Sequence, residues 1–293
     1  MTYQSAFLAG CVEGPAVLDG IRAALSRHEV IPHHDNVRIA MNGYSGGSHG
    51  SGWASHFAPS YAPELNIVGW VAGGLPADLA RTFAYNDGTV NSGLNFLGLA
   101  GLSAVYPKLD RYIRSHAKSN ATAVLDRITG ESGKSGAFCV SQSAALANLT
   151  LADSFNVKNI SDGAIVRQTW HDEYLGIYYA PVTNFPIWLV HSVEDNVVPY
   201  PQAREYVQSQ CAQGAGITFV SLPTGAHGAV QVLSSASQVE RLQSFLGHSN
   251  GYNDDRECKY ETSLPVSLND TSAKDLLGDY GFTLIQQAIA AAT

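Results

Sequence analysis

Residues Val37 to Tyr61, V-R-I-A-M-N-G-Y-S-G-G-S-H-G-S-G-W-A-S-H-F-A-P-S-Y, contain the pattern that decides the fold. A short β-prone run leads into Gly43-Tyr44-Ser45-Gly46-Gly47, which matches G-x-S-x-G, and a helix-compatible segment follows as far as Pro59. Strand, sharp turn and helix in this order form a nucleophile elbow. In such an elbow the serine lies on a strained turn, and the glycines two residues to either side are needed to let strand and helix approach each other. The pattern predicts that Ser45 is a nucleophile.

The same turn predicts one donor of an oxyanion hole. Gly46 would begin the helix, so its N–H would point toward the oxyanion that forms when Ser45 attacks an acyl carbonyl. Small residues can meet this pattern by chance in a chain with 28 glycines among 293 residues. The neighbouring strand and helix, and partners further along the chain, are what favour the catalytic interpretation.

Composition bounds the class of protein. A hydrophobic content of 45% in 293 residues allows a large core, either one large α/β domain or two small ones. Charged residues make up 14%, below the roughly 25% of an average soluble domain. With a net charge of -8 and no block of Lys or Arg, the sequence argues against nucleic acid as a partner and favours neutral substrates. No apolar run is long enough for an integral membrane segment.

Cysteines and glycosylation motifs favour an extracellular protein, although the N-terminus of this chain does not read as a signal peptide. The four cysteines have no C-x-x-C spacing for a metal or redox site; they are Cys11, Cys139, Cys211 and Cys258. Four N-x-[ST] sequons are candidate glycosylation sites: Asn120, Asn148, Asn159 and Asn269.

Further along, strands and helices alternate, which predicts a parallel α/β sheet. The predicted strands after the elbow are 67–71, 186–191 and 217–222. An acidic residue on the loop after a late strand is where a serine hydrolase keeps the carboxylate that orients its histidine. We predict that this residue is Asp195, with Glu194 as the alternative.

The predicted base is His227. Of the ten histidines it alone follows the last predicted strand and precedes a helix, at 229–246. His49 and His56 would be ordinary residues of the elbow helix. His33 and His34 are adjacent, but no third ligand is spaced with them, so no metal site is predicted.

The predicted domains are a hydrolase core with the elbow (1–80), a mostly helical cap (81–185), and a second part of the core (186–293) that carries the acid, the histidine and a C-terminal extension. Apolar and aromatic residues of the cap could line an acyl pocket. The simpler interpretation, which we favour, is that most of them form the core of the cap itself. These apolar and aromatic residues of the cap include 94–102, Trp170, Tyr174, Ile177, Tyr178 and Tyr179.

Together, the G-Y-S-G-G elbow, the run Y-A-P-E-L-N-I-V-G at 61–69 and the segments around Asp195 and His227 resemble the fungal secretory lipases of the lipase A type. The resemblance extends from about Ala6 to Leu246. It implies an α/β-hydrolase with a helical cap, exported and disulfide-bonded, that hydrolyses acylglycerols or other esters without a cofactor and could work at a lipid–water interface. It also suggests the pairs Cys11–Cys139 and Cys211–Cys258, one of three connectivities that four cysteines allow.

Members of that family have a long segment ahead of the point where this chain begins, with the first strands of the sheet and the second oxyanion donor. We find no counterpart of that segment, so the elbow strand is expected to have an open edge. A catalytically weak lipid-binding remnant is therefore one alternative to a triacylglycerol lipase. A short-chain esterase and a peptidase are the others, since one elbow serves all acyl transfers.

Overall fold

The computed structural model describes residues 5–29, 31, 36–130, 140–176, 183–247 and 257–263, and the single positions 274, 278, 279 and 283. The chain divides into two compact units. One, the sheet unit, comprises Gly14–Ala77 and Leu175–Thr293, and the other, the helical unit, comprises Met1–Glu13 and Asp78–Tyr174. Both units are thus built from two separate segments of the chain.

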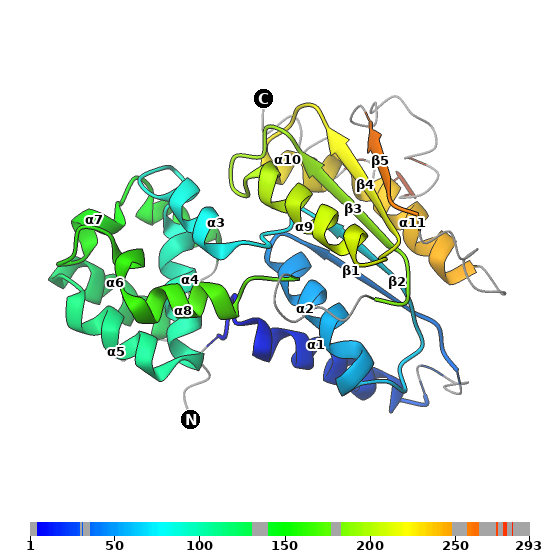
Figure 1. Ribbon diagram of the computed structural model, residues 1–293, viewed down its shortest axis with the longest axis horizontal. Helices are drawn as coiled ribbons and strands as arrows, with labels where there is room; N and C mark the ends of the chain where they lie inside the picture. The colour runs from blue at the N-terminus through cyan, green and yellow to red at the C-terminus, as the bar shows by residue number, and fades with distance from the viewer. Residues whose placement is uncertain are drawn as a thin grey trace. The chain divides into compact units, whose positions relative to one another are not determined.

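The sheet unit contains a five-stranded parallel sheet in the order β1-β2-β3-β4-β5 (Figure 1). Each strand therefore pairs with the next one along the chain, and β1 and β5 are the edges of the sheet in the described residues. Because all pairs are parallel, the carboxyl ends of the strands meet at one side of the sheet, where α/β proteins place their sites. The strands are β1 (Ile39–Tyr44), β2 (Ile67–Gly73), β3 (Ile187–Ser192), β4 (Ile217–Leu222) and β5 (Lys259–Thr262).

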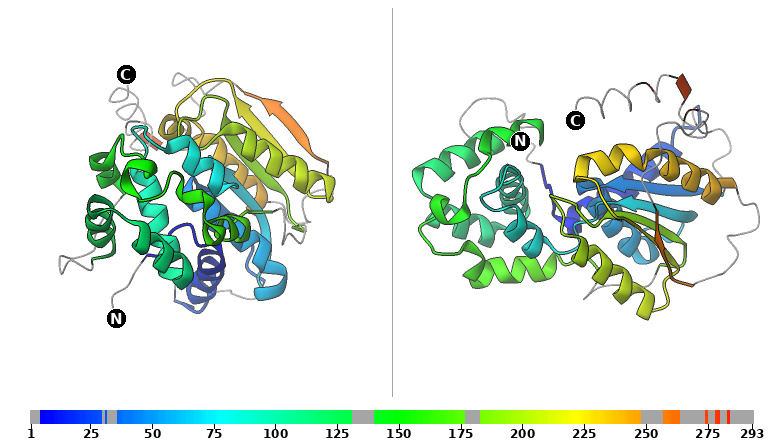
Figure 2. Two further views of the ribbon diagram at one scale, coloured as in Figure 1. Left: turned by 60° about the vertical axis from the view of Figure 1, so that its left-hand side comes forward. Right: turned by 90° about the horizontal axis from the view of Figure 1, so that it is seen from above.

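Helices cover both faces of this sheet, as Figure 2 shows from a second direction. On one face α1 (Gly10–Leu25), α2 (Gly46–Tyr61) and α9 (Tyr200–Ala212) pack against a cluster that includes Trp70 and Leu189. On the other face α10 (His227–Leu233) and α11 (Ser235–Gly247) pack against Val71 and Val190. Side chains alternate along each strand, so burial on both faces makes β3 buried along its whole length.

The helical unit forms its own core. The largest buried side chains come from several helices and include Phe83, Phe96, Leu99 and Trp170. Residues of the apolar stretch 94–102 therefore pack within this unit, as the simpler interpretation of the sequence had it, while residues 177–179 lie outside the described residues. The elements are α3 (Leu79–Asn86), α4 (Gly93–Val105), α5 (Pro107–His116), α6 (Ser119–Thr129), η1 (Val140–Leu146), α7 (Leu151–Ser154), η2 (Ile160–Asp162) and α8 (Ala164–Asp172).

The first residues of the chain also belong to the helical unit, although the sequence analysis placed them in the hydrolase core. Glu173 follows α8 and is completely buried. Its carboxylate accepts hydrogen bonds from the N–H of Gly10, at 2.7 Å, and from the hydroxyl of Tyr106. Because Gly10 begins α1, this carboxylate satisfies an N–H that the helix itself leaves unpaired.

Two elements differ from the sequence-based expectation. The helix predicted at 229–246 is two helices, because the chain bends at Ser234, whose hydroxyl donates to the carbonyl of Val230 at 2.7 Å. Strand β5 was not predicted at all. It has only four residues, all of them exposed, so it lacks the alternation of buried and exposed residues that reveals a strand.

One disulfide joins Cys211 of α9 to Cys258, next to β5, with a Cα–Cα distance of 6.0 Å. This is one of the two pairs that the family resemblance suggested. The other suggested pair stays a prediction, because Cys139 lies outside the described residues. Among the described residues Cys11 has no disulfide partner, and its Sγ is 3.8 Å from the hydroxyl oxygen of Tyr106.

Three of the four sequon asparagines, Asn120, Asn148 and Asn159, are exposed on the helical unit, and Asn269 lies outside the described residues. Whether they carry glycans stays a prediction. Among the helices in the described ranges, none has the length and apolar character needed to cross a bilayer.

We expect the disulfide to stabilise the sheet unit by closing a loop with a sequence separation of 47. Replacing Cys258 by Ser should lower the free energy of unfolding by about 2–4 kcal/mol. Urea denaturation followed by circular dichroism measures this. Cys11→Ser is the comparison variant and should unfold at the wild-type midpoint, because Cys11 has no disulfide partner among the described residues. Equal midpoints for Cys258→Ser and the wild type would contradict the prediction.

Candidate active site

Ser45 lies on the sharp turn between β1 and α2, with φ 56° and ψ -124°. A non-glycine residue with positive φ is strained, at a cost on the order of 1–3 kcal/mol, and persists only where its surroundings hold it. Here the N–H of Ser45 donates to the carbonyl of Gly73 at the end of β2, at 2.9 Å, and its own carbonyl accepts from the N–H groups of Ser48 and His49. The turn is thus fixed between the neighbouring strand and the first turn of α2.

The two outer glycines of the motif do not share one role. A Cβ on Gly43 would lie 2.2 Å from the carbonyl oxygen of Gly47, so only glycine fits at position 43. A Cβ on Gly47 would meet nothing within 4 Å. The expectation that both glycines are needed for the close approach is therefore right for Gly43 and wrong for Gly47, which contributes its backbone and not its missing side chain.

Asp195 and His227 meet at the carboxyl side of the sheet. Asp195 Oδ2 lies 2.7 Å from His227 Nδ1, and Asp195 Oδ1 accepts from the N–H groups of Val197, at 2.9 Å, and Val198, at 2.7 Å. Asp195 is buried, whereas Glu194, the alternative from the sequence, is exposed. Burial alone would raise the pKa of Asp195, but its hydrogen bonds and the nearby imidazoles together hold that pKa below its usual value.

His227 is the first residue of α10, and its backbone is held on both sides. Its N–H donates to Asn196 Oδ1 at 3.0 Å, and its carbonyl accepts from the hydroxyl of Tyr44 at 2.7 Å. The rings of Tyr44 and His227 are 5.0 Å apart between centroids. Burial raises the pKa of Tyr44, so its hydroxyl stays protonated as a donor.

Gly74 explains how closely the histidine approaches the elbow. It follows β2 with φ 55°, and a Cβ there would lie 2.7 Å from Cε1 of His227. Because Gly73 binds the backbone of Ser45, the imidazole lies against the residue next to the one that binds Ser45. Sequence reasoning missed Tyr44, Gly74 and Asn196. Their only signals were adjacency to the motif for Tyr44, adjacency to Asp195 for Asn196, and the G-G-L-P turn after β2.

The second nitrogen of His227, Nε2, is buried and has no hydrogen-bond partner in the described part of the chain. Because Nδ1 donates its proton to Asp195, a neutral imidazole carries its lone pair on Nε2. The structure therefore forms the Asp195–His227 bond but not a bond from His227 to Ser45. Such catalytic hydrogen bonds are often long or misaligned in unliganded enzymes, so the geometry is compatible with a general base.

The N–H of Gly46 is a candidate oxyanion donor. Gly46 is the first residue of α2, so its N–H has no acceptor within the helix and lies next to Ser45. The described residues do not identify a second donor.

The other histidines considered from the sequence have structural surroundings. His49 and His56 are buried residues of α2; His49 Nε2 accepts from Trp53 Nε1 at 3.2 Å, and the hydroxyl of Tyr206 lies 3.5 Å from His56 Nε2. His33 and His34 lie outside the described residues. Within the described ranges, no group of three or more His, Cys, Asp or Glu side chains is placed to hold a metal ion.

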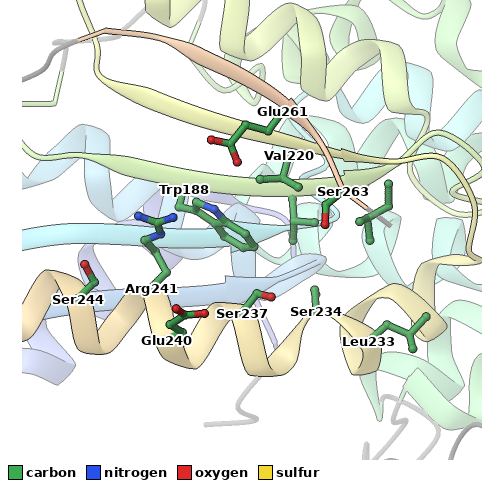
Figure 3. Close-up of a pocket in the computed structure, with 12 residues that line it drawn as sticks. Trp188, Val220, Leu233, Ser234, Ser237, Glu240, Arg241, Ser244, Glu261 and Ser263 are labelled. Carbon is green, nitrogen blue, oxygen red and sulfur yellow. The ribbon is translucent and has the colours of Figure 1, made fainter. Parts of the chain in front are cut away.

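A cavity of about 270 Å³ lies elsewhere in the sheet unit, between α11 and β3 to β5. Figure 3 shows Trp188 on the sheet side and Glu240 and Arg241 on the helix side. Ser45, Asp195 and His227 do not line it. The candidate active site is therefore at the carboxyl side of the sheet and not in this cavity.

A parallel sheet covered on both faces, with a serine on a strand–turn–helix elbow and an Asp–His pair after later strands, defines an α/β-hydrolase. The comparisons agree. The family model described as "Secretory lipase" matches residues 2–246. The chain belongs to the secretory lipase family.

Among its relatives, Lipase A of Moesziomyces aphidis is 36% identical over 230 residues, which cover 77% of this chain and 48% of the relative. The secreted triacylglycerol lipase LIP1 of Malassezia furfur is 35% identical over 272 residues, covering 91% of this chain and 54% of the relative. The chain thus spans about half the length of these two relatives.

Among solved structures, Candida antarctica lipase A in its closed state is similar, with a TM-score of 0.82 and 28% identity, covering 96% of this chain and 64% of that one. The rice cell wall degrading esterase LipA from Xanthomonas oryzae has a TM-score of 0.62 at 17% identity and covers 87% of this chain and 69% of that one, which shows a shared fold alone.

The different roles of the two outer glycines can be tested by replacing each with alanine. Gly43→Ala should abolish the elbow geometry or the fold, because the added Cβ cannot coexist with the Gly47 carbonyl 2.2 Å away. Gly47→Ala should keep wild-type stability or gain up to about 1 kcal/mol, since alanine suits a helix better than glycine. Thermal unfolding of the two variants measures both effects. Equal destabilisation of both would show that the steric account is wrong.

Proposed function

We propose that this chain is a serine hydrolase of carboxylic esters, most specifically a triacylglycerol lipase. The observation that carries the proposal is the Asp195–His227 bond of 2.7 Å, whose imidazole keeps an unpartnered buried Nε2 beside the strained elbow of Ser45. A buried nitrogen without a partner is costly, so a role that supplies a partner during reaction accounts for it.

In the proposed reaction, Ser45 Oγ attacks the acyl carbonyl while Nε2 of His227 takes its proton. Asp195 holds His227 in the tautomer that leaves Nε2 free and stabilises the imidazolium that forms. The N–H of Gly46 donates to the oxyanion of the tetrahedral intermediate. His227 then returns the proton to the leaving alcohol as the intermediate collapses to an acyl ester of Ser45. Water attacks this ester while His227 takes its proton, and His227 gives that proton to Ser45 Oγ as the carboxylic acid leaves. No metal or organic cofactor takes part.

The substrate class rests on the relatives, two of which bear the names lipase A and secreted triacylglycerol lipase. The low share of charged residues, 14%, suits neutral esters and a lipid–water interface. Names of relatives and the Cys211–Cys258 disulfide support an extracellular location, where lipid breakdown would take place.

The nucleophile is tested with an activity-based probe. A fluorophosphonate should label the chain at Ser45, and Ser45→Ala should abolish labelling and lower turnover on the order of a millionfold. Ser60→Ala is a matched control, because Ser60 is an exposed serine near the other end of the same helix, and it should keep the label on Ser45. Labelling that persists in Ser45→Ala would refute the assignment of the nucleophile.

The substrate class is tested by comparing esters of increasing acyl length, from butyrate to oleate, and emulsified trioleoylglycerol. A lipase should hydrolyse the long-chain emulsion, whereas a short-chain esterase should be active on butyrate alone. A chain that binds the emulsion but hydrolyses none of these esters and takes no label would instead be the catalytically weak lipid-binding remnant.

A further inference from the structure

A second histidine, His191, contacts the same carboxylate as His227. It lies on β3, four residues before Asp195, and is completely buried. Its Nε2 is 2.9 Å from the carbonyl oxygen of Val198 and 3.4 Å from Asp195 Oδ2. Its ring lies edge-on to Tyr200, with 6.0 Å between centroids. The three groups that it meets thus belong to the loop that carries the acid and to the start of α9.

The contacts determine the protonation state of His191. A backbone carbonyl can only accept, so Nε2 must carry the proton that it donates to Val198. Nδ1 is buried and has no hydrogen-bond partner among the described residues. A proton there would leave a charge and an N–H buried without an acceptor. Burial lowers the pKa of His191, against the opposing effects of Asp195 and the Val198 carbonyl, so the ring is neutral.

His191, Val198 and Asp195 are all in contact with one another. The peptide groups on either side of Val198 are both bound, because its N–H donates to Asp195 Oδ1 at 2.7 Å and its carbonyl accepts from His191. The turn from Asp195 to Val198 is therefore held from both ends. Oδ1 is committed to that turn, which leaves Oδ2 to face His227.

A core role alone does not account for His191. An apolar residue would fill a fully buried position without leaving a nitrogen unpaired, and the first four residues of β3 are apolar. Among the described residues, the polar contacts that distinguish a histidine here are a hydrogen bond from Nε2 to the Val198 carbonyl and the approach of Nε2 to Asp195, and both partners belong to the acid turn.

We propose that His191 is a positioning residue that fixes the Asp195–Val198 turn, so that the carboxylate of Asp195 faces His227 in the orientation that the base requires. The proposal rests on the proposed function of Ser45, Asp195 and His227. A misplacement of a catalytic group by about 1 Å can cost on the order of a hundredfold in rate.

Two amide substitutions of His191 test whether the hydrogen-bond donor must be at the position of Nε2. In His191→Gln the amide nitrogen takes the place of imidazole Nε2 and can donate to Val198, whereas in His191→Asn it takes the place of Nδ1 and cannot. The rate of fluorophosphonate labelling of Ser45 in the full chain should fall on the order of a hundredfold in His191→Asn and by no more than a few-fold in His191→Gln. Labelling of His191→Asn at the wild-type rate, or equal loss in both variants, would overturn the proposal.

A second measurement uses the unaltered protein, in case neither variant folds. Nitrogen-15 NMR of labelled histidines should show His191 as the neutral Nε2–H tautomer at neutral pH. An Nδ1–H tautomer or a charged ring would overturn the proposal, because the Val198 carbonyl would then not be held as described. Failure of the proposed function is separately visible: the wild type would take no label, while the tautomer of His191 would still be measurable.

Discussion

The buried negative charge of Asp195 is the constraint on which the site depends. A carboxylate taken out of water is costly unless donors surround it, and here two backbone N–H groups bind one oxygen while imidazole N–H groups approach the other. These donors come from the loop after β3, from β3 itself and from the start of α10. Satisfying this one charge thus fixes the relative positions of segments that are separate in the sequence.

The elbow is constrained by shape and not by charge. Positive φ at Ser45 is kept because its N–H is bonded to β2 and its carbonyl to the first turn of α2, and the absence of a side chain at Gly43 leaves room for that turn. The two constraints meet at Gly74, where the rings of His227 and Tyr44 leave no space for a Cβ.

The sequence alone predicted those parts of the candidate site that occur in a fixed order along the chain. The elbow, the acid loop and the histidine loop were each indicated by a short pattern beside a predicted strand, and β4 has the predicted bounds. The sequence did not predict roles that depend on contacts between distant residues. Tyr44 binds the carbonyl of His227, which lies 183 positions further along the chain. His191 could not be told from the other residues of a buried strand. Strand β5 was missed because its exposed residues owe their place to pairing with β4 and to a nearby disulfide, neither of which leaves a periodic pattern.

The division of both units into two chain segments has a consequence for protein synthesis. Strands β1 and β2 leave the ribosome before the stretch Asp78–Tyr174, and their neighbour β3 follows only after the whole of that stretch has been made. The start of α1 likewise waits for Glu173, 163 positions later, to cap it. Long-range parallel pairing is slow and leaves apolar strands exposed. The nascent chain therefore passes through a period in which β2 lacks its neighbour β3 and is available to chaperones, or to other unfinished chains, before the sheet unit can close.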